Sequence, residues 1–163
     1  MLFLQEQDGS YSPAPKKLVL TEANRLISYQ LRRGSLIISS DCAKKIIGYK
    51  LRGRQNEVFA CLFLDSRHRI LAFKEMFFGT INHTTVHPRE ILKEALLLNA
   101  AAVILAHNHP SGGSEPSKQD IHLTNTLRDI LKVVDVRILD HLIVGDEVTA
   151  FSDLGLLQEK KNQ

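Results

Sequence analysis

The sequence predicts an α/β fold in which helices flank a mixed β-sheet, and three observations lead to this class. Short apolar runs at residues 58–64 and 101–106 are typical of strands buried on both faces. Segments with apolar residues at helical spacing stand before, between and after these runs. The chain has 163 residues, which suits one domain with a core of its own. This mixed order of helices and strands favours one sheet with helices on both faces.

The chain is predicted to begin with a lead-in segment and a first helix. Residues 5–17 are polar and rich in turn formers, so we expect them to be flexible. Thr21 is then expected to cap a helix whose apolar side chains recur at helical spacing, and Gly34 is expected to end it.

A second helix is predicted between two adjacent serines and a glycine. Ser39 or Ser40 is expected to cap this helix, and Gly53 is expected to close it. Basic residues are frequent in and just after the segment, and we interpret them as a solvated helix face rather than a nucleic-acid patch. They are Lys44, Lys45, Lys50, Arg52 and Arg54.

Strands are predicted for the middle of the chain. The continuous apolar run Val58–Leu64 is followed by a polar turn at residues 65–68. Residues 70–73 are expected to return as the hairpin partner of the first strand, and residues 76–81 to continue the sheet.

The second half of the chain is predicted to alternate between helices and strands. Pro88 suits the first position of a helix. The apolar run at residues 101–106 is expected to be a strand that stops at His107, and Ser117 to cap the helix that follows a loop rich in glycine and proline. Three short strands are expected after that helix, at residues 136–139, 141–144 and 148–151.

Composition and charge narrow the class of protein. The formal net charge is +3, which is mildly basic and short of a dedicated nucleic-acid binder. No apolar run approaches the ~18 residues that span a bilayer, and no basic segment precedes the apolar residues 1–4, so we expect neither a membrane span nor a signal peptide. Cys42 and Cys61 are isolated, which favours free thiols in the core and a reducing, cytoplasmic location.

A metal site is predicted where the strand at residues 101–106 ends. His107 and His109 are two residues apart, so their side chains point to the same face of a strand and can converge on one ion. Asp120 lies in the first turn of the next helix, and the intervening loop can fold that turn back over the strand end. Two histidines and one carboxylate leave a fourth position for water, which is the composition of a catalytic zinc site. We therefore predict one Zn²⁺ ion held by these three residues.

Two further residues are candidates for the chemistry. Zinc activates water near neutral pH, and a general base that is not a ligand removes the proton. Glu57 is the candidate base, because a carboxylate where a strand begins can reach a site on a neighbouring strand. Ser117 is the candidate donor to the oxyanion that develops on an attacked carbonyl. Each signal alone has a simpler explanation, since Ser117 and Asp120 also match a capping-box pattern, but their joint spacing favours the metal site.

The spacing of these residues resembles the JAMM (MPN-plus) metalloprotease motif. That motif has an upstream Glu, then H-x-H-P, then S-x-x-D. Its positions are matched here, without departure, by Glu57, His107, His109, Pro110, Ser117 and Asp120. The surrounding segments resemble the bacterial RadC branch of the family, and they are residues 79–81, 86–90, 106–112 and 139–145.

The resemblance implies a fold, a division of the chain and an activity. The fold would be JAB/MPN-like, a mixed β-sheet flanked by helices in the layers also seen in cytidine deaminases, with zinc at the sheet edge. Residues 1–35 would be an N-terminal extension with one helix, residues 36–157 the MPN/JAMM metalloprotease-like domain, and residues 158–163 a tail. Members of the family cleave peptide or isopeptide bonds, notably those of ubiquitin-like modifiers. His107, His109 and Asp120 would bind zinc, Glu57 would be the general acid/base and Ser117 the oxyanion donor.

Other functions stay open at this stage. A DNA-repair role is attached to the RadC branch by name, and it would take the form of a nuclease or of a non-catalytic binding module. Only about 35 residues precede the metalloprotease-like part, and they lack the helix-hairpin-helix pattern of full-length RadC, which weakens direct DNA binding. Deamination is disfavoured because the H-x-E and P-C-x-x-C patterns of zinc deaminases are absent. The oligomeric state is open, with a homodimer as one option.

One further histidine has two interpretations. His141 beside Asp140 either orients the imidazole of a metal ligand or belongs to a polar pair at a strand edge. We favour the strand-edge pair.

Overall fold

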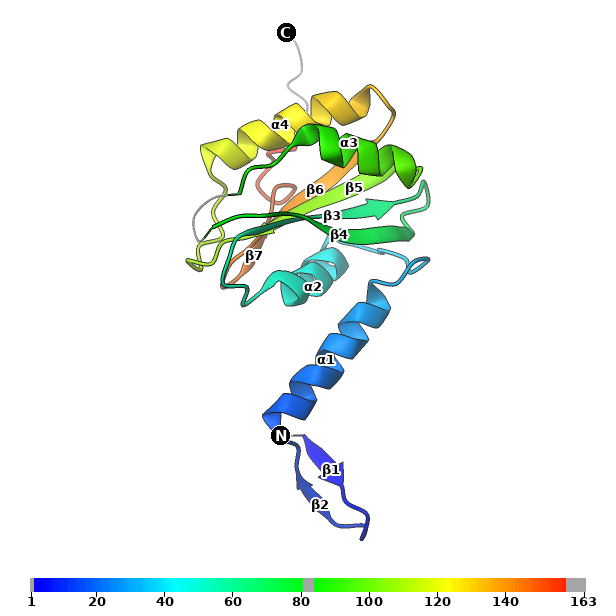
Figure 1. The fold of residues 1–163 in the computed structure, drawn as a ribbon, viewed down its shortest axis with the longest axis vertical. Helices are drawn as coiled ribbons and strands as arrows, with labels where there is room; N and C mark the ends of the chain where they lie inside the picture. Colours follow the sequence, from blue (N-terminus) through cyan, green and yellow to red (C-terminus); the bar gives the residue numbers. More distant parts are fainter. Residues whose placement is uncertain (1, 81–83, 158–163) are drawn as a thin grey trace.

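The computed structural model describes residues 2–80 and 84–157, and its main body is a β-sheet between two helical layers (Figure 1). Helix α2 lies on one face of the sheet, and α3 and α4 lie on the other. The elements are β1 (Phe3–Gln5), β2 (Tyr11–Pro13), α1 (Lys16–Gln30), α2 (Ser40–Leu51), β3 (Val58–Leu64), β4 (Ile70–Phe78), α3 (Pro88–Leu97), β5 (Ala102–Asn108), α4 (Lys118–Lys132), β6 (Arg137–Val144) and β7 (Val148–Ala150).

The large sheet is mixed, as the sequence predicts. Its strand order is β4-β3-β5-β6-β7. Strands β5 and β6 run parallel, and the other three neighbouring pairs are antiparallel. Because β5 is the middle strand and every residue in it is buried, its last residues are held firmly where the strand opens into a loop. This confirms the predicted α/β class.

Two apolar clusters explain why the central strands are apolar throughout. In β3, alternate side chains such as Ala60 and Leu62 join the cluster under α2, while Phe59, Cys61 and Phe63 join the cluster under α3 and α4. A strand that is covered on both faces needs apolar residues at every position, not at every second one. Cys61 is fully buried in this packing, and its thiol is free.

The predicted flexible lead-in is wrong. Strands β1 and β2 pair antiparallel as a small hairpin, and α1 begins at Lys16 directly after Pro15. Thr21 is therefore inside the helix and not at its cap, and its hydroxyl donates to the Lys17 carbonyl one turn back. Polar composition misled the prediction, because pairing in such a short hairpin depends on backbone hydrogen bonds.

The strand boundaries also differ from the prediction, most clearly in β4, β5 and β6. Strand β4 runs without a break from Ile70 to Phe78, and residue 81 lies outside the described residues. Strand β5 continues through His107 to Asn108. Strand β6 passes through Asp140 without interruption, because its buried carboxylate accepts hydrogen bonds from the Ser40 and Ser152 hydroxyls.

The predicted helix starts in the domain are confirmed. Ser39 caps α2 by accepting from the backbone N–H of Cys42, Pro88 is the first residue of α3, and Ser117 caps α4. Helix α1 and the β1–β2 hairpin project away from the sheet (Figure 1). Among the residues that the structure describes, no helix combines the length and the apolarity that a membrane crossing needs.

Candidate metal centre

The last residues of β5 deliver the first histidine of the candidate site. His107 follows Val103 and Leu105 on the face under α3 and α4, and its side chain is buried. The imidazole stacks on the ring of Phe59 from the neighbouring strand, with ring centres 6.1 Å apart and planes 10° apart. The orientation of His107 is therefore fixed by the sheet.

The second histidine is held by the loop after β5. The backbone N–H of His109 donates to the Val144 carbonyl, and its ring Nδ1 lies 3.0 Å from the Gly113 carbonyl. Gly145 in the β6–β7 turn packs directly against this loop, since a Cβ there would lie 2.2 Å from the Gly112 carbonyl oxygen. The close contact of two glycines thus sets the position of the His109 ring.

The carboxylate comes from the first turn of α4. Ser117 and Asp120 form a capping box, in which the Asp120 N–H donates to the Ser117 hydroxyl. The Ser117 N–H and hydroxyl both donate to Oδ2 of Asp120, at 2.8 and 2.6 Å. Capping and ligation are compatible, because Oδ1 of the same carboxylate lies 3.3 Å from Nε2 of His107.

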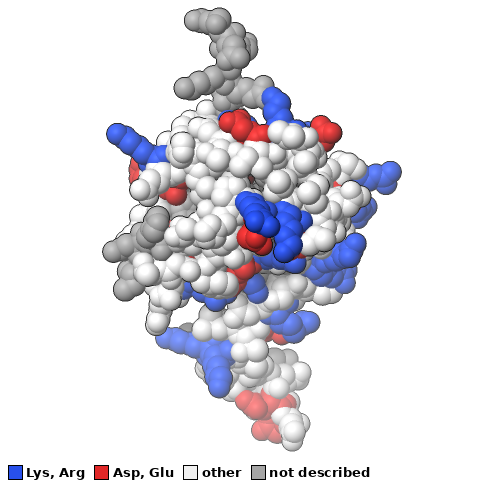
Figure 2. Space-filling model, turned by 45° about the horizontal axis from the view of Figure 1, so that its top comes forward, with Lys and Arg blue, Asp and Glu red and all other residues white. Residues whose placement is uncertain are grey.

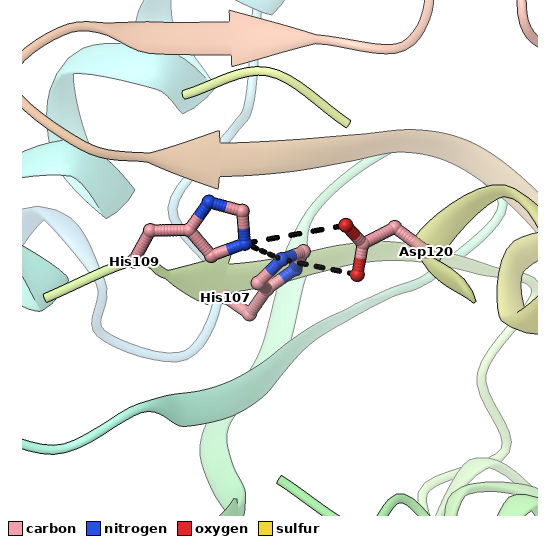
Figure 3. Close-up of side chains that lie close together, drawn as sticks. All are labelled: His107, His109 and Asp120. Carbon is pink, nitrogen blue, oxygen red and sulfur yellow. Dashed lines mark hydrogen bonds and ion pairs between the residues drawn. The ribbon is translucent and has the colours of Figure 1, made fainter. Parts of the chain in front are cut away.

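These three side chains converge, as Figure 3 shows. Nε2 of His107 lies 2.9 Å from Nε2 of His109, and the latter lies 4.0 Å from Asp120 Oδ2. Donors around a tetrahedral ion with bonds of ~2.0–2.1 Å stand about 3.3 Å apart, so the observed separations bracket that value. His107, His109 and Asp120 could therefore hold one metal ion.

Burial keeps His107 in the state that binds metal, and it keeps His141 neutral behind it. Burial lowers the pKa of His107 from its ordinary value to about 4, and the nearby Asp120 carboxylate only partly offsets this. Burial also lowers the pKa of His141 well below its ordinary value. At neutral pH both rings are neutral, and a neutral imidazole is the form that coordinates a metal.

His141 contacts the candidate ligand His107, so the predicted strand-edge pair is wrong. β6 is an inner strand, and the fully buried ring of His141 lies with Nε2 2.9 Å from Nδ1 of His107. On its other side, Nδ1 of His141 lies 2.6 Å from the hydroxyl of Thr124 in α4. Asp140 faces Ser40 and takes no part in this contact. The structure thus favours the interpretation that His141 orients a ligand imidazole.

Glu57 lies just before β3 and lines the same open cleft as the three candidate ligands. Its backbone is held on both sides, since its N–H donates to the Thr80 carbonyl and its carbonyl accepts from Gly79 and Thr84. The cleft has a volume of about 460 Å³. Its described lining is Glu57, Phe59, Thr84, Thr85, Val86, His107, His109, Pro110, Ser111, Ser117, Gln119, Asp120 and Leu123.

Asn108 is a residue that the sequence reasoning missed. Its side-chain oxygen accepts from the Val58 N–H at 2.8 Å, and its amide nitrogen donates to the Asn56 carbonyl at 3.1 Å. These bonds join the end of β5 to the backbone on both sides of Glu57. The available signal was an asparagine that directly follows a buried apolar strand and lies between two histidines. An amide that is buried with the strand end needs hydrogen-bond partners.

Comparison with known proteins places the chain in a family. The RadC-like JAB domain matches residues 37–156. A UPF0758 protein of Thioalkalivibrio sulfidiphilus is 50% identical over 149 residues, which are 91% of this chain and 67% of that protein. A UPF0758 protein of Nitrosococcus oceani is 51% identical over 139 residues, or 85% of this chain and 62% of that protein.

A shorter relative is matched almost over its whole length. A UPF0758 protein of Vibrio cholerae is 47% identical over 139 residues, which are 85% of this chain and 88% of that protein. By contrast, the chain spans only about two thirds of the first two relatives. The names of these relatives state no activity. The match of the domain over residues 37–156, together with these identities, shows that the chain belongs to the RadC-like JAB domain family.

Proposed function

We propose that this chain is a zinc-dependent hydrolase that cleaves amide bonds in peptides or isopeptides. The observation that supports this most is the convergence of His107, His109 and Asp120 in an open cleft that Glu57 also lines. Three protein donors with one open side are typical of catalytic zinc sites, whereas structural sites use four.

The donor set suits zinc. Two imidazole nitrogens and one carboxylate oxygen are ligands that zinc accepts in a tetrahedral arrangement. When bound, the ion would supply a Lewis acid that makes water a nucleophile near neutral pH and polarises a carbonyl. His107, His109 and Asp120 would hold it, each through one atom.

Glu57 would carry the proton. Its carboxylate is not one of the three clustered donors, and it belongs to the backbone segment that Asn108 ties to the end of β5. From the cleft wall it would accept a proton from the attacking water and return it to the leaving amine.

Ser117 would donate to the oxyanion on the attacked carbonyl. Its hydroxyl now donates to Oδ2 of Asp120, so it would have to turn toward the substrate. The carboxylate would keep a partner after this turn, because the backbone N–H of Ser117 donates to the same oxygen.

The charge of the cleft favours an amide over a phosphodiester as substrate. Its described lining contains two carboxylates and no Lys or Arg that would pair with phosphate. Helix α2, which carries Lys44, Lys45 and Lys50, lies on the face of the sheet opposite α3 and α4. Lys44 is paired with Asp153, and Arg54 after the helix is paired with Glu75. On the face seen in Figure 2, Lys and Arg form separate groups interspersed with Asp and Glu.

The test combines metal analysis with a substrate screen. We expect purified protein to bind one zinc ion per chain and to hydrolyse members of a fluorogenic peptide library or a peptide linked through a lysine side chain. Glu57→Gln should keep the zinc and lose about 10²–10⁴-fold in hydrolysis rate, the usual contribution of a general acid/base.

A matched control variant and an assay with DNA as the substrate complete this test. Glu147→Gln changes an exposed glutamate outside the cleft lining and should leave hydrolysis unchanged. Full zinc loading without cleavage of any amide substrate would count against the proposal. Cleavage of single- or double-stranded DNA that depends on zinc and on Glu57 would replace it with a nuclease.

A further inference from the structure

The hydrogen bonds around Thr124 have only one consistent direction. The Thr124 hydroxyl lies 2.6 Å from the backbone carbonyl of Asp120 and 2.6 Å from Nδ1 of His141. A carbonyl can only accept, so the single hydroxyl proton of Thr124 goes to Asp120. Nδ1 of His141 must then carry a proton and donate it to the Thr124 oxygen.

This direction determines which nitrogen of His107 carries a proton. With its proton on Nδ1, the neutral ring of His141 has a lone pair on Nε2, and that atom lies 2.9 Å from Nδ1 of His107. Nδ1 of His107 is therefore the donor in this contact. The lone pair of His107 is left on Nε2, the atom that faces His109 and Asp120.

The same logic applies independently to His109. Its Nδ1 lies 3.0 Å from the Gly113 carbonyl, which can only accept. In the neutral form of His109 the lone pair is therefore also on Nε2. In that form two nitrogen lone pairs face each other at 2.9 Å beside a carboxylate, and a cation between them, a proton or a metal ion, relieves their repulsion.

We propose that Thr124 and His141 are positioning residues that fix the tautomer of His107 and thereby prepare the site for its metal. This inference rests on the proposed metal centre and names residues beyond its ligands and its acid/base. The series of bonds starts at the backbone of one ligand, Asp120, and ends at the ring of another, His107. It therefore links the two elements that carry these ligands, α4 and β5, through His141 of β6.

Packing holds this series of bonds in place. His141 is fully buried. The centre of its ring lies 4.6 Å from the ring centre of Phe151 and 5.7 Å from that of Phe59, which it meets edge-on. Thr124 is also buried in α4. Water cannot readily substitute for a missing partner in such surroundings, so losing the Thr124 hydroxyl leaves His141 free to adopt the other tautomer.

Thr124→Val is the sharpest variant, and Thr124→Ser is its matched control. Valine keeps the shape of the side chain and removes the hydroxyl, whereas serine keeps the hydroxyl. We expect Thr124→Val to weaken Zn²⁺ binding by about 10–100-fold in competition with a chelating dye, as is usual when a partner of a ligand histidine is lost. Thr124→Ser should stay close to wild type.

Nitrogen NMR of the metal-free protein supplies a second readout. In wild type and Thr124→Ser, the ring ¹⁵N shifts of His107 should show a protonated Nδ1 and an unprotonated Nε2. In Thr124→Val a second His107 tautomer should be populated. This measurement on the wild-type chain needs neither a variant that folds nor a substrate.

The outcomes separate this inference from the proposed function. A protonated Nε2 on His107 in the metal-free wild type would overturn the positioning role, whatever the protein hydrolyses. Equal Zn²⁺ affinity of Thr124→Val and wild type would do the same. If the tautomer and the affinities behave as expected and no substrate is cleaved, the inference stands and the proposed hydrolase fails.

Discussion

At the scale of single residues, the candidate site depends on histidines that are buried and neutral. The ring of His107 stacks on Phe59, its Nε2 lies near the carboxylate of Asp120, and its Nδ1 contacts His141. A neutral imidazole can offer a lone pair to a cation, and burial keeps the imidazole neutral because it makes protonation costly. The property that suits the site for a metal therefore also links the stability of the metal-free protein to pH.

We expect the metal-free protein to lose stability as the pH falls from about 6.5 to about 4. The pKa of His107 is about 4 in the folded chain against an ordinary value of 6.5, so between these values the unfolded chain binds a proton that the folded chain does not. The contribution is complete above pH 6.5 and is lost as the pH falls toward 4. Urea unfolding at several pH values should show a slope of up to about 1.4 kcal/mol per pH unit from this group.

Two variants identify the source of this slope. His107→Gln removes the buried ring and should reduce the pH dependence. His122→Gln removes an exposed ring from α4 and should leave it unchanged. An identical slope in His107→Gln and wild type would mean that other groups cause the acid sensitivity.

At the scale of helices and strands, the features that were predicted correctly from the sequence are those that depend on residues adjacent in the chain. The apolar run Val58–Leu64 and the Ser117 cap of α4 were predicted with their observed bounds, because burial on two faces and helix capping depend on adjacent residues. The clustering of His107, His109 and Asp120 was also predicted, since one strand end and one short loop carry all three.

Other features depend on partners that are distant in the sequence. His141 contacts His107 because β5 and β6 pair in parallel with a register shift beside Val103, and neither spacing nor composition encodes that register. The sequence predicted two strands on either side of Asp140, yet β6 is continuous there, because Ser152 and Ser40, the latter 100 positions away in the sequence, donate to its carboxylate. Such pairings follow from the packed sheet and cannot be seen along the chain.

The loop between β5 and α4 gives a prediction at this scale. A side chain at Gly145 would collide with the Gly112 and Gly113 carbonyl oxygens, at 2.2 and 2.7 Å, so Gly145→Ala must displace the loop. The Gly113 carbonyl holds the His109 ring, and its movement should weaken Zn²⁺ binding by about 10-fold or more. Calorimetric titration of the metal-free protein would measure this change.

The control for this loop is Gly113, whose carbonyl takes part in the contact but whose Cα faces open space. Gly113→Ala meets nothing within 4 Å, so it should bind Zn²⁺ as wild type does. Equal affinities of Gly145→Ala and Gly113→Ala would show that the loop does not set the position of His109.

At the scale of the whole molecule, the candidate ligands come from three segments that the sheet alone does not join. His107 is the last residue but one of β5, His109 follows in the loop, and Asp120 lies in the first turn of α4. A metal bound there would cross-link the middle strand of the sheet to the helical layer above it. Because a cation binds only where all three meet, it stabilises the folded chain and not the unfolded one.

We therefore expect Zn²⁺ to raise the free energy of unfolding and its removal to lower it. At a free concentration 100 times the dissociation constant the gain is about 2.7 kcal/mol, which corresponds to about 5–10 °C in Tm for a chain of this size. Scanning calorimetry with Zn²⁺ and with a chelator would measure the shift.

His109→Ala removes one donor from the partly exposed side of the cluster and should abolish most of the shift while the sheet stays intact. A shift of the same size in this variant would place the binding ion elsewhere on the molecule, and the convergence of the three side chains would then have to be explained without a metal.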